Sequence, residues 1–272
     1  MALSRAQLGV RDTYAGLDFD GIGSVTIGRQ LVASYNYVDW PHSNPGLGYV
    51  FDWNNDIGVS YQDRADNVLR FDSATWKGVN FQATVSGMEG GLDQAVLSAG
   101  VAYSHSIFKI HAAIYSRGKY EINESEVDKY IFDDNGNTIL NPDYIEGGKL
   151  LTKYANRYGL IGGSLHFDDL TFTAAYKAMQ VDTATDKSTQ NAFSTTVKYL
   201  LNNKVEFKAG YAMTTDAEID GVTKHNSGDQ AITGRIGYLL PSTFLYTEVR
   251  NYKMNGGTKR FNQVNLGIKY FL

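Results

Sequence analysis

The sequence predicts an all-β fold, a transmembrane antiparallel up-and-down β-barrel, and three observations lead to this prediction. Apolar and polar side chains alternate along many segments, which is the pattern of a strand with two unlike faces. Tight turns alternate with longer connections along the chain. Many candidate strands are also about 10–13 residues long, near the length that crosses a bilayer at a tilt.

Thirteen candidate strands follow from the alternation in chain order. They span residues 10–19, 23–30, 64–73, 78–87, 93–105, 108–122, 157–167, 170–182, 190–201, 204–216, 229–240, 244–255 and 261–272. In the tenth segment, for example, Val205, Phe207 and Ala209 share one parity, whereas Glu206 and Lys208 occupy the other. No segment reads convincingly as an amphipathic helix longer than a few turns.

The connections between these segments differ in length. Short connections lie at 20–23, 106–107, 168–169, 201–203 and 241–243, and longer ones at 31–63, 123–156, 183–189 and 217–228. A meander of hairpins then has its tight turns at one end and most long loops at the other, as outer-membrane barrels do. A soluble β-sandwich or soluble up-and-down barrel is the alternative, because alternation is common to all these folds.

The composition supports a many-stranded antiparallel sheet. The 272 residues include 28 Gly, 19 Tyr, 4 Pro and no Cys, and the absence of Cys excludes disulfides, thiolate metal sites and a cysteine nucleophile. A net charge of −4 argues against a nucleic-acid partner. No run of about 18 apolar residues predicts a transmembrane helix. The mean hydropathy of −0.31 is compatible with a barrel, because half of each strand faces water.

The first residues, MALSRAQLGVRDTY, show no signal-peptide pattern, because no basic region leads into an apolar run. This start indicates a leader already removed, an internal beginning or a cytosolic protein.

Three segments resemble the general porin family of the bacterial outer membrane. Residues 11–17 (RDTYAGL) followed by 23–30 (GSVTIGRQ) are similar to the family hairpin R-x-x-[YF]-x-G-L…G-[ST]-[VF]-x-[LIY]-G-R. Residues 64–73 (RADNVLRFDS) resemble the strand that follows the family's inward-folded loop. Residues 264–272 (VNLGIKYFL) resemble the closing strand, although Leu272 stands where the family has a terminal Phe.

The resemblance implies a single barrel domain over residues 1–272 of the sixteen-stranded porin type. In that family the inward-folded loop lies between the fifth and sixth strands, whereas here residues 31–63 follow the second candidate strand. The chain thus has three strands fewer before this loop than the family has. An open sheet of thirteen strands would leave two unpaired edges, and we therefore expect that three N-terminal strands are lacking. Residues 123–156 are expected to form a long extracellular loop.

The same resemblance assigns residues 31–63 to the constriction of a pore. Its acids include Asp39, Asp52 and Asp56, and Arg29 and Arg70 match basic wall positions opposite such a loop. Parity places Arg70 inward. It places Arg29 outward unless the strand breaks at Gly28, and we assume that break.

Parity further predicts a set of charged side chains that line the lumen. They are Lys109, Arg117, Lys177, Lys198, Lys208, Arg235, Glu248 and Arg250. The solvated face of a soluble sheet would show the same pattern.

Other chemistry finds little support in the sequence. Residues 133–137 (DDNGN) fail as a calcium loop, since Thr138 and Tyr144 occupy positions that need Gly and Glu. Five scattered His have no ligand spacing, and neither a nucleophile elbow nor a phosphate loop is present. No metal or cofactor is expected.

The resemblance implies an outer-membrane channel, not an enzyme, for passive diffusion of ions and small hydrophilic solutes. Outer-membrane lipid, lipopolysaccharide and two further copies of the chain are the expected partners. An outer-membrane barrel serving as receptor, adhesin or enzyme, and a soluble β-sandwich binding module, are the alternatives.

Overall fold

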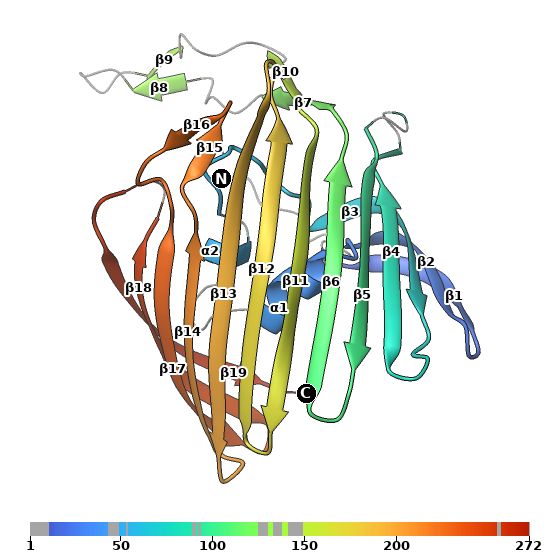
Figure 1. Ribbon diagram of the computed structural model, residues 1–272, viewed down its shortest axis with the longest axis vertical. Helices are drawn as coiled ribbons and strands as arrows, with labels where there is room; N and C mark the ends of the chain where they lie inside the picture. Colours follow the sequence, from blue (N-terminus) through green and yellow to red (C-terminus); the bar gives the residue numbers. More distant parts are fainter. Residues whose placement is uncertain are drawn as a thin grey trace.

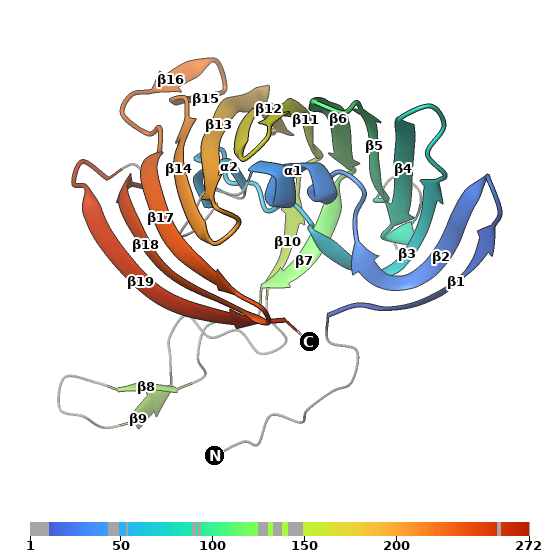
Figure 2. The ribbon, with the colours of Figure 1, turned by 90° about the horizontal axis from the view of Figure 1, so that it is seen from below.

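One curved antiparallel sheet dominates the computed structural model (Figures 1 and 2). The structure describes residues 11–42, 49–52, 54–88, 91, 94–124, 130–132, 138–140, 149–254 and 257–271. The path of the sheet runs β1-β2-β3-β4-β5-β6-β11-β12-β13-β14-β17-β18-β19. The thirteen strands predicted from the alternation are confirmed as the strands of this path.

The strand bounds lie close to the predicted segments. The path consists of β1 (Thr13–Phe19), β2 (Gly23–Leu31), β3 (Arg64–Ser73), β4 (Val79–Ser86), β5 (Val96–Ser104), β6 (Phe108–Arg117), β11 (Asn156–Phe167), β12 (Leu170–Asp182), β13 (Lys187–Leu201), β14 (Val205–Thr214), β17 (Gln230–Leu240), β18 (Thr243–Lys253) and β19 (Phe261–Tyr270). Each strand pairs with the next in antiparallel register. Within the described residues the path ends at β1 and β19, which do not pair with each other.

The tight turns gather at the lower end of the sheet in Figure 1. Asp168, Asn202 and Asn203 adopt positive φ there, a conformation that Asp and Asn accept more readily than most residues. The short connections thereby join strands with little loss of register. The predicted asymmetry between the two ends of the sheet is confirmed.

Several short strands in the long connections were not predicted. β15 (Ala217–Ile219) and β16 (Val222–Lys224) form a hairpin, and β15 also pairs with β13. Two small sheets lie within or beside the predicted loop 123–156: β7 (Tyr120–Glu124) with β10 (Lys149–Lys153), and β8 (Tyr130–Phe132) with β9 (Thr138–Leu140). Segments of three to five residues are too short for alternation to reveal.

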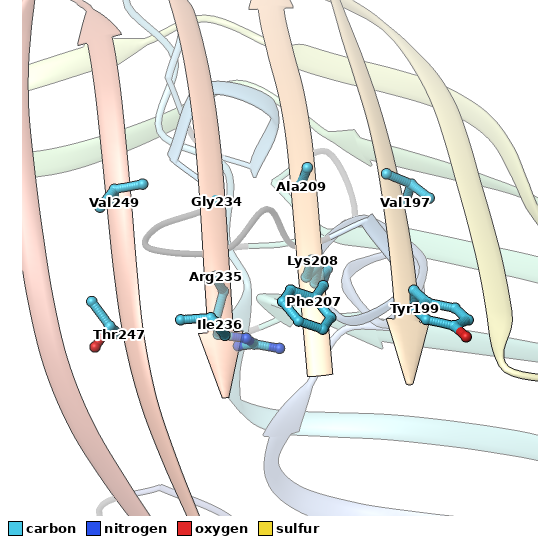
Figure 3. Close-up of a pocket in the computed structure, with 10 residues that line it drawn as sticks. All are labelled: Val197, Tyr199, Phe207, Lys208, Ala209, Gly234, Arg235, Ile236, Thr247 and Val249. Carbon is cyan, nitrogen blue, oxygen red and sulfur yellow. The ribbon is translucent and has the colours of Figure 1, made fainter. Parts of the chain in front are cut away.

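The outer face of the sheet is apolar. Ile114, Ile161, Phe193 and Ile232 expose 65, 61, 41 and 54 % of their surface, which would cost free energy in water but not against lipid. Figure 3 shows Val197, Phe207 and Ile236 on the opposite side of their strands from Lys208 and Arg235. A soluble β-sandwich would instead cover such a face with a second sheet.

Two helices lie inside the curve of the sheet (Figure 2). They are α1 (Tyr35–His42) and α2 (Tyr49–Asp52), both within residues 31–63. Among the described residues, no helix has the length and apolar character needed to cross a membrane. The predicted constriction segment is therefore folded into the concave side of the sheet.

Candidate functional site

The loop of residues 31–63 is held on the inner wall by wall side chains that bond to its backbone. At its start, the Ala33 amide donates to Thr84 Oγ1 (3.1 Å) and the Ser34 amide to Ser98 Oγ (2.7 Å). The Ser34 hydroxyl lies 2.8 Å from the Tyr158 hydroxyl. All of these groups are buried. Because buried amides need partners, the wall side chains fix where the loop begins its inward course.

A histidine pair joins the end of α1 to the wall. His42 Nε2 lies 2.8 Å from Nε2 of His111 on β6, and both side chains are buried. A Cβ at position 162 would come within 2.5 Å of His42 Nε2, so only glycine leaves room for this contact. Burial lowers the pKa of His42 to about 3, and the nearby His111 and Lys208 lower it further. At neutral pH one imidazole therefore donates to the other.

Lys177 of β12 holds the end of α2. Its Nζ donates to the main-chain oxygens of Phe51 (2.5 Å) and Asp52 (2.6 Å), and the side chain is 1 % exposed. A cation at the carboxyl end of a helix satisfies carbonyls that have no partner within the helix. Its ammonium also lies 5.2 Å from the centre of the Phe51 ring. Lys177 therefore faces inward as predicted, but it contacts the loop and not the lumen.

The remainder of the loop is held by similar contacts. Asn54 donates to Asp229 Oδ2 (2.7 Å), the Asp56 amide to Gln190 Oε1 (2.7 Å), and the Gln62 amide to the Tyr115 hydroxyl (3.1 Å). The strands β4, β5, β6, β11, β12 and β13 each contribute side chains that bond to the loop. We name the inward side chains of these strands the covered arc.

Three tyrosine rings pack together between the returning loop and the covered arc. The rings of Tyr115 and Tyr158 are parallel with centroids 5.1 Å apart, and Tyr61 meets both edge-on at 5.5 and 4.8 Å. Both arrangements are favourable for aromatic pairs. Burial raises the pKa of Tyr61 above its usual range, so its hydroxyl stays neutral. The cluster makes this side of the loop a packed contact.

The loop acids lie against the wall. Asp52 accepts from the Tyr35 hydroxyl (3.2 Å), and Asp56 lies 3.8 Å from Lys224 of β16 with 8 % of its side chain exposed. Asp39 lies within α1, and its side chain is outside the described part of the chain. These contacts of Asp52 and Asp56 do not include Arg70, and a constriction formed by these acids facing the wall arginines stays a prediction.

Arg70 lies on the inner face, as parity predicted. Its guanidinium bonds to both carboxylate oxygens of Asp72 (2.6 and 2.7 Å) and to the Leu31 oxygen (3.4 Å). A two-pronged pair of this kind is geometrically specific and cancels the charge locally.

The break of the strand at Gly28, which was assumed in order to turn Arg29 inward, is wrong, because β2 continues to Leu31. The strand irregularity at Gly28 exists, but β3 holds the extra residue, since Gly28 and Gln30 pair with Val68 and Ala65. Alternation along β2 therefore continues, and Gln30 turns inward and accepts from Thr26 (2.9 Å). Arg29 forms an ion pair with Asp66 (2.9 Å), whose side chain is 69 % exposed.

A second group of charges follows the inner wall beyond the loop contacts. Lys208 pairs in register with Lys198 and Arg235, and Arg235 pairs with Glu248. Arg235 forms ion pairs with Glu206 (2.7 Å) and Glu248 (3.2 Å). We name the inward charged side chains of β14, β17 and β18 the charged arc. Among the described residues, Arg235 of this arc bonds to two glutamate side chains, whereas Lys177 of the covered arc bonds to the loop backbone.

The other predicted lumen residues also share the inner parity. Lys109 is exposed near the turn end of β6, whereas the guanidinium carbon of Arg117 lies 3.3 Å from the centre of the Tyr120 ring. Arg250 is buried, contacts Met254 Sδ (3.0 Å) and stacks on Tyr252. Only some of the inward charges are therefore accessible to solvent.

Six further residues hold the loop and were not among the site residues predicted from the sequence. They are Thr84, Ser98, Tyr158, Gln190, Ser194 and Asp229, and Ser194 donates to the His42 oxygen (3.0 Å). Each of the first five lies on the inward parity of its strand, and this parity was the signal by which the sequence could have indicated them. Small polar residues on that parity look the same whether they face water or a loop.

An apolar outer face, a polar inner face and a loop folded inward together define an outer-membrane β-barrel. The sequence model of the family described as Gram-negative porin matches residues 4–272, and this chain belongs to that family. A protein of Vibrio furnissii named chitoporin is 33 % identical over 254 residues, 91 % of this chain and 66 % of that protein. The chain thus spans just under two thirds of the length of that relative.

Solved structures agree on the fold. An anion-selective porin from Comamonas acidovorans superposes with a TM-score of 0.67 at 15 % identity, covering 96 % of this chain and 77 % of that one. OmpT, an outer membrane protein of Vibrio cholerae, gives a TM-score of 0.66 at 14 % identity, covering 94 and 78 %. At these identities the likeness concerns the fold alone.

Proposed function

We propose that this protein is an outer-membrane channel for passive diffusion of ions and small hydrophilic solutes. The observation that carries the proposal is the loop 31–63, which lies inside a sheet with an apolar exterior and is bonded to its inner wall. A loop held in this way narrows a lumen to a fixed size. The solute would pass between the loop and the charged arc, where side-chain charges tune ion preference.

The proposal describes transport without covalent chemistry. The described part of the chain contains no cluster of three or more metal-ligating side chains, and two of the inward arginines, Arg70 and Arg235, form ion pairs with carboxylates of the wall. The membrane partners would be outer-membrane lipid and lipopolysaccharide on the apolar face. One structure of Vibrio cholerae OmpT is described as a trimer form. We propose that this protein also forms a homotrimer.

The solute class is suggested by the relative that is named chitoporin. Chitin oligosaccharides are neutral and hydrophilic, which suits a polar inner wall on which Arg70 and Arg235 are paired with carboxylates. They are therefore the first solutes to test.

The test is the ionic conductance of the detergent-purified protein in a planar bilayer, with vesicle swelling for neutral solutes. We expect stable ohmic steps, grouped in threes if the protein is trimeric, and swelling rates that fall as solute size increases. A detergent-dependent protein that produces neither steps nor swelling would contradict the channel proposal. Solubility without detergent would favour a soluble binding module instead.

A further inference from the structure

A polar pocket lies on the inner wall beside β1, β2 and β3, where the loop leaves β2 at Leu31. Its volume is about 250 Å³, and its lining includes Tyr14, Ser24, Thr26, Gln30, Arg70 and Asp72. Thr26 pairs in register with Gly16 on one side and with Arg70 on the other. Since positions across the ladder face the same way, the pocket opens toward the interior of the sheet.

The charged groups of the pocket cancel. Arg70 is bonded in two places to Asp72, and Asp12, which also lines the pocket, is 2.7 Å from Arg64. An anion near either guanidinium would be repelled by the carboxylate beside it. A cation near either carboxylate would be repelled by the guanidinium beside it. The pocket therefore favours a neutral ligand over an ion.

The pocket also has unused hydrogen-bonding groups. Arg70 carries five N–H donors, and its bonds to Asp72 and Leu31 use three of them. Within the described part of the chain, the hydroxyls of Tyr14 and Ser24 form no side-chain hydrogen bond, and Tyr14 is 57 % exposed. Donors, acceptors and a flat ring thus converge on one small volume.

We propose that this pocket is a binding subsite for one neutral pyranose ring of a saccharide solute. The inference rests on the proposed channel function and assigns a solute class to it. Ring hydroxyls can accept from the spare N–H groups of Arg70 and donate to the carboxylate of Asp72. The C–H face of the sugar can lie on the Tyr14 ring, since tyrosine offers an apolar body and a polar tip.

The test measures equilibrium binding of a chitin tetrasaccharide to the full chain in detergent. Calorimetry or saturation-transfer NMR gives the affinity. We expect Tyr14→Ala to weaken binding at least tenfold and Tyr14→Phe two- to threefold, because the second variant keeps the ring. Tyr238→Ala is the matched control, because Tyr238 is a tyrosine of similar exposure (44 %) on the outer face. It should bind as the unmodified chain does.

Circular dichroism checks that each variant is folded, and Tyr14→Phe keeps the test decisive if Tyr14→Ala does not fold. Equal affinity in Tyr14→Ala and the unmodified chain, or equal weakening in the Tyr238 control, would overturn the subsite. Ionic conductance without saccharide binding overturns the subsite alone. Saccharide binding that depends on Tyr14, from a chain that does not conduct, leaves the subsite standing and overturns the channel.

Discussion

The covered arc and the charged arc belong to one sheet and share one parity, yet their side chains do different things. Lys177 in the covered arc bonds to the Phe51 and Asp52 carbonyls, whereas Arg235 in the charged arc bonds to the Glu206 and Glu248 side chains. The first residue positions the loop and the second belongs to a wall that a solute could meet. What lies opposite a strand thus decides the role of its inward charges.

The largest expected effect is that of Lys177→Met. A methionine of similar length cannot donate, so two buried carbonyls lose a charged partner and loop docking should weaken by about 3 kcal/mol. Hydrogen exchange of the α2 amides measures this. The control is Lys198→Met on β13, whose side chain shares the inner parity and has no bond to the described residues of the loop. Equal exchange in both variants would show that the Lys177 ammonium does not hold the loop.

The second effect concerns pH. Docked His42 has a pKa of about 3, and a released His42 would have an ordinary value near 6.5. At a pH between these two pKa values, His42 binds a proton only when the loop is released. The free energy of loop docking should therefore weaken by about 1.4 kcal/mol for each pH unit as the pH falls.

Hydrogen exchange of the α1 amides from pH 7 to pH 4 measures the change in docking. In His42→Phe the dependence should be absent or much reduced. A slope that persists in this variant would assign the titration to another group.

A smaller effect is expected for Tyr158→Phe in the covered arc. The ring stack with Tyr115 is kept, while the contact with the Ser34 hydroxyl is lost, which should cost about 1 kcal/mol of loop docking. The same exchange experiment measures it. Tyr238→Phe on the outer face should leave docking unchanged, and a similar loss there would indicate a general effect of hydroxyl removal.

The smallest expected effect on stability, below about 1 kcal/mol, is that of Arg235→Gln in the charged arc. Its main consequence would be electrostatic, because Glu206 and Glu248 lose their counter-charge and the lumen becomes more favourable to cations. The reversal potential in a salt gradient measures this shift. Arg157→Gln removes the partner of Asp182 on the outer face and should leave the reversal potential unchanged.

Alternation predicted the strands because a pleated strand exposes successive side chains to opposite surroundings. It also predicted the inward parity of Lys177, Arg235 and Arg250. Arg29 could not be predicted, because the bulge residue sits on the neighbouring strand at Asp66 and Asn67 and leaves no sign in β2. Ser98 and Gln190 were missed because the amides they bind lie far away in the chain.

The attachment of the loop along the covered arc would also set the shape of the molecules that pass. A lumen narrowed from one side is an off-axis slit and not a round hole. Such an opening sorts molecules by their thinnest cross-section and not by their mass. A long, flat chain would then pass more easily than a compact molecule of the same weight.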